Sequence, residues 1–256
     1  MDTTAPTPIP LEPRRISIRL PRPLWIGLAT VVLVVVGLAL PIYRQQLAIR
    51  EIQRFGGRIE TRHGGPEWAR RILRDEWMQP FDEVETIYLG HTDFTDADLT
   101  HLRQLTALRN LDLSGTMVTD AGLAQLEGLV NLEELYLNGT QVGGECVAHL
   151  VRLTRLQRLS FDYTNLTDDG VAGLKGMKGL QRLYLKRTHV TDAGLAHLKT
   201  LTNLIWLQLS GTQITDAGLI HLEGLKNLRE LDVGETRVTS AGLIELKRAL
   251  PRVRLR

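Results

Sequence analysis

The sequence has little of what disulfide-bonded or catalytic proteins usually depend on. It contains one cysteine, Cys146, among 256 residues, which excludes an internal disulfide framework. The G-x-S-x-G, H-E-x-x-H, Walker A and dinucleotide-binding motifs are also absent. No catalytic residue, cofactor site or metal site is therefore predicted, and the chain is not expected to be an enzyme.

An excess of charge of one sign is missing as well, because the formal net charge is only +2. The charge is unevenly divided. Residues 1–80 hold 12 arginines against 7 acidic residues, whereas residues 81–256 hold 19 basic and 22 acidic residues. The first part suits anionic lipid headgroups, while the second lacks the basic footprint of nucleic-acid binding. No nucleic-acid partner is predicted.

What the sequence does have is a repeat of 24 residues that occurs seven times without insertion or deletion. It can be written L-x-x-L-x-L-x-x-T-x-V-T-D-x-G-L-x-x-L-x-x-L, and its copies begin at Val84, Leu108, Leu132, Leu156, Leu180, Leu204 and Leu228. Leucines first alternate with polar residues, as in a strand, and then recur at threefold spacing, as on one face of a short helix. Such a unit buries its leucines only by stacking on its neighbours, so a solenoid is predicted.

Two further recurrent features have structural explanations. A threonine follows each strand, where its hydroxyl can bond unpaired backbone groups, so these threonines are predicted to form a structural ladder; they are Thr92, Thr116, Thr140, Thr164, Thr188, Thr212 and Thr236. Thr-Asp pairs such as Thr119-Asp120, Thr167-Asp168, Thr191-Asp192 and Thr215-Asp216 resemble a helix N-cap followed by a first-turn carboxylate.

This pattern, from Val84 to the end of the chain, resembles the leucine-rich-repeat family. The Thr-Asp-x-Gly-Leu ending is similar to the cysteine-containing class of repeats in F-box partner proteins and in bacterial internalin-like proteins, although threonine replaces the usual asparagine or cysteine. The order of the segments is similar to that of small membrane-anchored bacterial repeat proteins. The resemblance implies an α/β solenoid with a curved parallel sheet on the concave side, short helices on the convex side and a binding role without a named ligand.

The repeat that begins at Leu132 departs from the consensus. Gly143-Gly144-Glu145-Cys146 replaces Thr-Asp-Ala-Gly, and losing the cap should cost that turn about 1 kcal/mol. Drift, local loosening and a loop adapted to a ligand all remain open. Because Cys146 stands where other repeats have glycine, a small half-buried residue is favoured over a reactive thiol.

Four histidines fall in one column of the repeat: His101, His149, His197 and His221. Each precedes a leucine of the buried stripe. No cysteine or clear third ligand accompanies them, so a solvated convex column is preferred to a metal site.

The remaining third of the chain contains one long apolar run, Leu24 to Leu40, with no charged residue. Its roughly 25 Å length as a helix, extended to Tyr43, approaches the hydrocarbon thickness of a bilayer. Trp25 and Tyr43 stand at its ends as interfacial anchors would. A single transmembrane helix over residues 24–43 is predicted, with a cleaved signal peptide as the alternative.

The predicted orientation of the helix in the membrane depends on a small difference in flanking charge, since four arginines precede the apolar run closely and three follow it. This favours a cytoplasmic N-terminus and an extracytoplasmic repeat domain, with the opposite topology kept open. Four regions result: a disordered Pro/Arg-rich tail (1–23), the transmembrane helix (24–43), a juxtamembrane helix and N-terminal cap (44–83) and the repeat domain (84–256), which closes with an edge strand. Pro66 to Met78 is the natural candidate for the cap.

The side chains that face outward from the central strands are predicted to bind a partner. Aromatic residues and arginines gather there, and these residue types are enriched at interface hot spots. The candidate residues are Tyr136, Arg158, Asp162, Tyr163, Arg182, Tyr184, Lys186, Arg187 and Trp206.

The sequence therefore predicts a membrane-anchored repeat protein for noncovalent recognition of a protein or peptide. A structural or self-assembling envelope component is one alternative. A cytoplasmic adaptor resembling F-box repeat proteins is another, although the tail and anchor leave no evident room for an F-box.

Overall fold

The computed structural model describes residues 22–65, 67–72 and 74–256, without the side chains of 22–36, 38, 68–70, 75 and 76. Most of the predicted tail, residues 1–21, lies outside this range. The chain divides into two compact units, Met1–Leu40 and Pro41–Arg256. The second unit contains every strand described below.

Helix α1 (Arg22–Arg54) includes the whole predicted span and has Pro41 in its interior. Most side chains of that span are not described. Within the described part of the chain, no helix has the length and apolar character needed to cross a bilayer.

Nine strands form one sheet in sequence order, β1 to β9. Strand β1 is antiparallel to β2, and every later pair is parallel with a register offset of 24 residues, as in Asn110 opposite Glu134. The strands are β1 (Arg58–Arg62), β2 (Glu83–Tyr88), β3 (Asn110–Asp112), β4 (Glu134–Tyr136), β5 (Arg158–Ser160), β6 (Arg182–Tyr184), β7 (Trp206–Gln208), β8 (Glu230–Asp232) and β9 (Arg254–Leu255). The predicted parallel sheet is confirmed.

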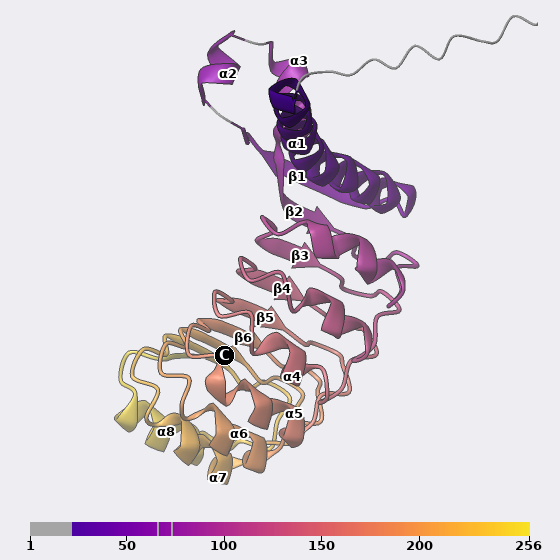
Figure 1. Cartoon of the computed structure of the whole chain (residues 1–256). Coiled ribbons are helices and arrows are strands. Elements are labelled where there is room, and N and C mark those ends of the chain that lie inside the picture. The colour runs from indigo at the N-terminus through magenta and orange to yellow at the C-terminus, as the bar shows by residue number, and fades with distance from the viewer. Residues whose placement is uncertain (1–21, 66, 73) are drawn as a thin grey trace, which may run out of the picture. The chain divides into compact units, whose positions relative to one another are not determined.

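Short helices follow the strands and line the opposite, outer side of the curved array (Figure 1). They are the α-helices α4 (Val147–Leu150), α5 (Asp168–Gly173), α6 (Asp192–Leu198), α7 (Asp216–Leu219) and α8 (Ser240–Ala249), with the 3₁₀ helices η2 (Asp98–Gln104), η3 (Gly122–Leu126), η4 (Leu174–Gly176) and η5 (Ile220–Leu222). The sheet therefore lines the inner side of the curve, and its outward residues face open space.

The core is a stack of leucine rows between the strands and the helices. Leu111, Leu135 and Leu159 are paired across neighbouring strands and are fully buried. Leu123 and Leu126 of η3 meet this row from the helical side, also without exposure. Each coil buries its leucines against the coils on both sides, which explains why the 24-residue spacing admits no insertion.

The hydroxyl of the threonine that follows each strand forms a hydrogen bond within its own coil. The Thr116 hydroxyl donates to the Leu113 carbonyl at 2.6 Å, and all seven threonines of the column make the same bond. Thr116 and Thr140 are buried, so the bond satisfies a polar group that water cannot reach. The structural role predicted for this column is confirmed.

The Thr-Asp pairs cap some of the short helices and also connect neighbouring coils. Thr191 and Thr215 accept from the amides of Ala193 and Ala217, as predicted, whereas Thr167 makes no side-chain cap bond. Helix η3 follows Ala121 instead of Thr119, which makes the predicted cap there wrong.

The aspartates of these pairs reach the next coil. Asp168 accepts from the backbone amide of Thr191 at 2.8 Å and from its hydroxyl at 2.6 Å. The pairs Asp96 with Thr119, Asp192 with Thr215 and Asp216 with Thr239 repeat this arrangement. The result is a ladder of carboxylates between coils.

The ladder is interrupted at the Gly143-Gly144 departure. Asp120 still accepts from the amide of Gly143 at 2.9 Å, but Gly144 offers no carboxylate to Thr167. A side chain at Gly144 would lie 3.0 Å from the backbone nitrogen of Gly170, so the two backbones approach closely where the carboxylate is missing. Cys146 is fully buried, beyond the half-burial that the sequence suggested.

The first coil is covered by the end of α1 and by β1. Ala48 and Ile52 of α1 are buried in the core, and the ring of Phe55 packs edge-on against Phe94 at 5.2 Å. Within the predicted cap segment, the structure describes α2 (Glu67–Ile72) and α3 (Asp75–Met78), and Ile72 and Trp77 are 76% and 70% exposed. The cover therefore comes mainly from residues earlier in the chain than the sequence suggested.

Candidate binding face

The strand register places most of the predicted residues in two rows on the open face of the sheet. Arg158, Arg182 and Trp206 lie opposite one another on β5, β6 and β7. Tyr136 and Tyr184 belong to the next row, on either side of Ser160. Neighbouring strands are about 4.8 Å apart, so these side chains form one continuous surface.

Within this surface, Tyr136, Glu134 and Arg158 form a closed network. The Tyr136 hydroxyl donates to Glu134 at 2.7 Å, while Arg158 donates to both Glu134 at 3.0 Å and the Tyr136 oxygen at 2.7 Å. Burial, with a further contribution from Glu134, raises the pKa of Tyr136 to about 12. The folded chain therefore favours the neutral phenol.

Tyr184 and Trp206 form the aromatic part of the surface. Their ring centroids are 6.1 Å apart, and the guanidinium of Arg256 lies over the Trp206 ring at 4.9 Å. Arg256 also pairs with Glu230 at 2.7 Å. Sequence reasoning missed Arg256 because the period breaks near Pro251, although continuing the 24-residue spacing from Asp232 would have found it.

The predicted residues at the ends of the strands form a rim of the face, and two of them have an uncommon backbone conformation. Tyr163 and Arg187 have φ values of 59° and 52°, in the left-handed region that favours glycine. Gly115, Gly139 and Gly211 occupy the same repeat position with similar φ, whereas Glu235 at that position has φ 57°. The fold requires this conformation in every coil, and several coils keep a large side chain there despite its cost.

These rim side chains contact one another. The Lys186 ammonium and the Arg187 guanidinium lie 5.7 and 5.9 Å from the centre of the Tyr163 ring. Arg187 also reaches across Gly211 to pair with Glu235 at 2.7 Å. A side chain at Gly211 would lie 2.7 Å from Cγ of Arg187, so glycine leaves the path open.

Asp162 has a role within the array. Its carboxylate accepts from the backbone amide of Lys186 at 2.7 Å, and its own amide donates to Asn138 at 3.0 Å. Burial raises its pKa, opposed by the Lys186 amide. The structure thus gives this predicted site residue a bonding partner in the next coil, like the Asp–Thr ladder.

Charged residues lie along the whole array. Beside the first coils, Arg109 lies between Glu85 and Glu133 at 3.2 and 3.1 Å. A hollow of about 380 Å³ has Tyr88 and Asp112 among its lining residues. The later coils carry the arginines and lysine described above, and Glu230 and Glu235 pair with two of these arginines.

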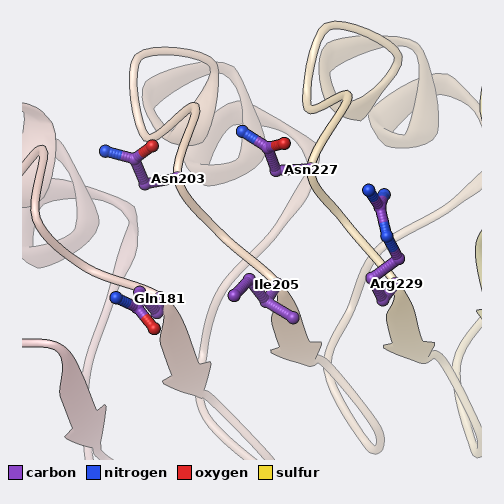
Figure 2. A pocket seen from close by; sticks show the side chains of 5 residues that line it. All are labelled: Gln181, Asn203, Ile205, Asn227 and Arg229. Carbon is purple, nitrogen blue, oxygen red and sulfur yellow. The ribbon is translucent and has the colours of Figure 1, made fainter.

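A second hollow, of about 230 Å³, lies at the strand-entry edge (Figure 2). Gln181, Ile205 and Arg229 line it at the starts of successive strands, with Asn203 and Asn227 beside them. Each asparagine amide donates to a carbonyl of the preceding coil, Lys178 and Thr202 respectively. None of the predicted binding residues lies in this hollow.

The histidine column contains no metal site in the described residues, where no three histidine, cysteine, aspartate or glutamate side chains come together. His149 pairs with Glu127 at 2.7 Å, and this bond lowers the pKa of Glu127. The pair links neighbouring coils on the helical side.

Comparison with known proteins agrees with this geometry. A family model described as leucine-rich repeat matches residues 200–222. Among solved structures, an internalin from Listeria monocytogenes strain 4b F2365 aligns with a TM-score of 0.55 and 21% identity, over 66% of this chain and 46% of its own. Internalin C2 from the same strain aligns with a TM-score of 0.56 and 27% identity, over 67% of this chain and 70% of its own. No curated protein sequence matches the chain.

The chain thus spans less than half of the first internalin and about two thirds of the second. The predicted leucine-rich repeats and their internalin-like form are confirmed. A fold of this kind is a scaffold for protein–protein recognition.

Proposed function

We propose that this leucine-rich-repeat protein recognises a protein or peptide partner, without chemistry, through the open face of strands β4 to β7. The observation that carries the proposal is the continuous surface formed by Arg158, Arg182 and Trp206 with Tyr184. Large aromatic groups and arginines on a preformed face provide contact area with little further loss of conformational freedom on binding.

A photo-crosslinking experiment in membranes of the source organism tests this function. A benzoylphenylalanine replaces Tyr184 on the open face in one variant and Ile220, which is exposed on the helical side, in the other. An adduct with another protein from position 184 alone is expected. Equal adducts from both positions would contradict the proposal, and adducts only between two copies of the chain would favour the self-assembling alternative.

A second test of this function replaces side chains on the open face. Changing Arg182 and Tyr184 together to alanine should weaken binding of the captured protein by several kcal/mol, in the range of hot-spot pairs. Both side chains point away from the leucine rows, so the array should stay folded. An affinity equal to that of the unchanged chain would remove this face from consideration.

We also propose that residues 24–43 anchor the chain as a single transmembrane helix, with the repeat domain on the extracytoplasmic side. The uncharged run from Leu24 to Leu40, the continuous helix over it and the flanking arginines support the proposal. The anchor would hold the binding face near the membrane surface.

Extraction of membranes at alkaline pH tests the anchor. The chain should stay in the membrane pellet, and a variant with Val34 and Val35 both changed to arginine should be released. Release of the unchanged chain would exclude the anchor. Protease-accessibility reporters fused to each end decide the orientation, since a C-terminal reporter reached only from the cytoplasm would reverse it.

A further inference from the structure

The open face of β6 and the turn that follows it present two cations on either side of an aromatic ring. Arg182, Tyr184 and Lys186 alternate with the buried Leu183 and Leu185, so their side chains point to the same side of the sheet. At about 3.3 Å per residue, the backbone positions of the two cations are roughly 13 Å apart along an extended chain. Arg182 and Tyr184 lie in β6, and Lys186 lies in the turn that follows it.

The cations around Arg182 differ in whether they already have a partner. Arg158 is bonded to Glu134, Arg187 to Glu235 and Arg256 to Glu230. No ion pair is formed by Arg182 or by the Lys186 ammonium among the described residues. The Lys186 ammonium lies over the Tyr163 ring and interacts electrostatically with the carboxylate of Asp162.

Neither register neighbour of Arg182 carries a carboxylate. Its neighbours in the register are Arg158 and Trp206, and Tyr184 stands between Ser160 and Gln208 in the next row. Two further donors in the row of Arg182, Nε of Arg158 and Nε1 of Trp206, are buried without an acceptor. Donors without acceptors outnumber acceptors without donors on this part of the face, so a ligand that supplies carboxylate and carbonyl oxygens fits it.

From this geometry we propose that β6 binds an extended acidic segment of the partner protein, with two carboxylates four residues apart and an apolar residue midway between them. In an extended chain, residues four apart are about 13 Å apart, which matches the separation of Arg182 and Lys186. The apolar residue packs on Tyr184 and Trp206. This inference rests on the proposed recognition function and names the chemistry of the partner.

Two carboxylates at this spacing gain charge-assisted hydrogen bonds from both cations at once. A segment with the same two carboxylates side by side reaches only one of them, because each extended residue advances the chain by about 3.3 Å. The spacing of the two carboxylates therefore distinguishes binding at this site from nonspecific attraction of acidic peptides to positive charge. Binding should also weaken at high salt, because both cations are close to solvent.

The test uses the full chain in detergent micelles and fluorescence anisotropy of labelled peptides. The probe peptide contains Glu-Ser-Leu-Ser-Glu, one control contains Glu-Glu-Leu-Ser-Ser, with the same composition, and another contains Gln-Ser-Leu-Ser-Gln. We expect the probe to bind about tenfold more tightly than either control, in line with one charge-assisted hydrogen bond. Equal affinity for the probe and the adjacent-glutamate control overturns the proposal.

Substitutions locate the site. Arg182→Gln and Lys186→Gln should each weaken probe binding at least fivefold, whereas Lys199→Gln, which makes the same charge change on the exposed helical side, should leave it unchanged. Thermal unfolding of each variant, followed by circular dichroism, verifies that the array remains folded. Equal losses from Lys199→Gln and Arg182→Gln would contradict the proposal.

Other outcomes are also decisive. Binding to vesicles of anionic phospholipid but to none of the peptides would assign the cations to the membrane surface and overturn the inference. A protein adduct at position 184 without probe binding would leave the proposed function standing and reject the acidic segment. Failure of both experiments rejects both proposals.

Discussion

Asp168 holds Thr191 of the following coil by two hydrogen bonds, accepting from the backbone amide at 2.8 Å and from the hydroxyl at 2.6 Å. The residues are 23 positions apart in the sequence. This bond adds a polar contact between coils to the leucine rows and the strand pairing. Its repetition places a row of such bonds at the starts of the short helices.

Changing Asp168 to alanine should therefore destabilise the array by about 1.5–3 kcal/mol, because it removes an ionised acceptor from two donors. Asp169→Ala is the matched control, since Asp169 carries the same charge in the same helical turn and is exposed. The free energy of unfolding of the full chain in detergent, from urea titration, gives the comparison. Equal losses in both variants would assign the effect to the helix dipole instead of the ladder.

The buried thiol of Cys146 should not react in the folded protein. Burial, with Asp120 nearby, raises its pKa well above that of a free thiol, and its sulfur lies 3.5 Å from the Gly143 carbonyl. A disulfide reagent should modify the native chain far more slowly than the urea-unfolded chain, because only the thiolate attacks. As this is the only cysteine in the sequence, the assay reports one site. Rapid modification of the native chain would show that this coil opens.

The repeat pattern predicted the parts of the fold that depend on side-chain periodicity. Leucine spacing gave the buried rows, and the absence of insertions gave the register that brings Arg158, Arg182 and Trp206 together. The same pattern could not show that Asp168 points to the next coil, because an aspartate after threonine is equally suited to a helix end. A glycine stands three positions after Thr191, and this glycine could have indicated the contact. A side chain at Gly194 would lie 2.3 Å from Asp168, so only glycine leaves room for the carboxylate.

The ends of the array were less predictable for a physical reason. A terminal coil has one neighbour, so its cover need not obey the period. Ile52 lies in the last turn of α1 and Phe55 directly after that helix, and Arg256 meets Trp206 only after the chain has passed the turn at Pro251. Contacts of this kind depend on the path of the chain and not on residue spacing.

Tyr136 should ionise at a higher pH than a free tyrosine. Its pKa is raised from 10.0 to about 12, so the folded state favours the neutral phenol. The stabilisation that this phenol contributes is complete below pH 10 and is lost as the pH rises through about 12. The difference in phenolate absorbance between the unchanged chain and Tyr136→Phe should have its midpoint near the higher value. A midpoint near 10 would show that the network with Glu134 and Arg158 is open in solution.

The left-handed residues of the rim should cost stability that glycine would restore. Glu235 has φ 57°, a conformation that disfavours any residue with a Cβ, and its ion pair with Arg187 is exposed and contributes little. Glu235→Gly and Glu235→Ala both remove the ion pair, but only glycine relieves the backbone. The glycine variant should unfold at a higher urea concentration, with an advantage of about 1 kcal/mol over the alanine variant. Equal stability of the two would mean that the backbone at this position relaxes when the side chain is shortened. If the expected difference is found, the chain keeps His91, Tyr163, Arg187 and Glu235 at a cost that Gly115, Gly139 and Gly211 avoid.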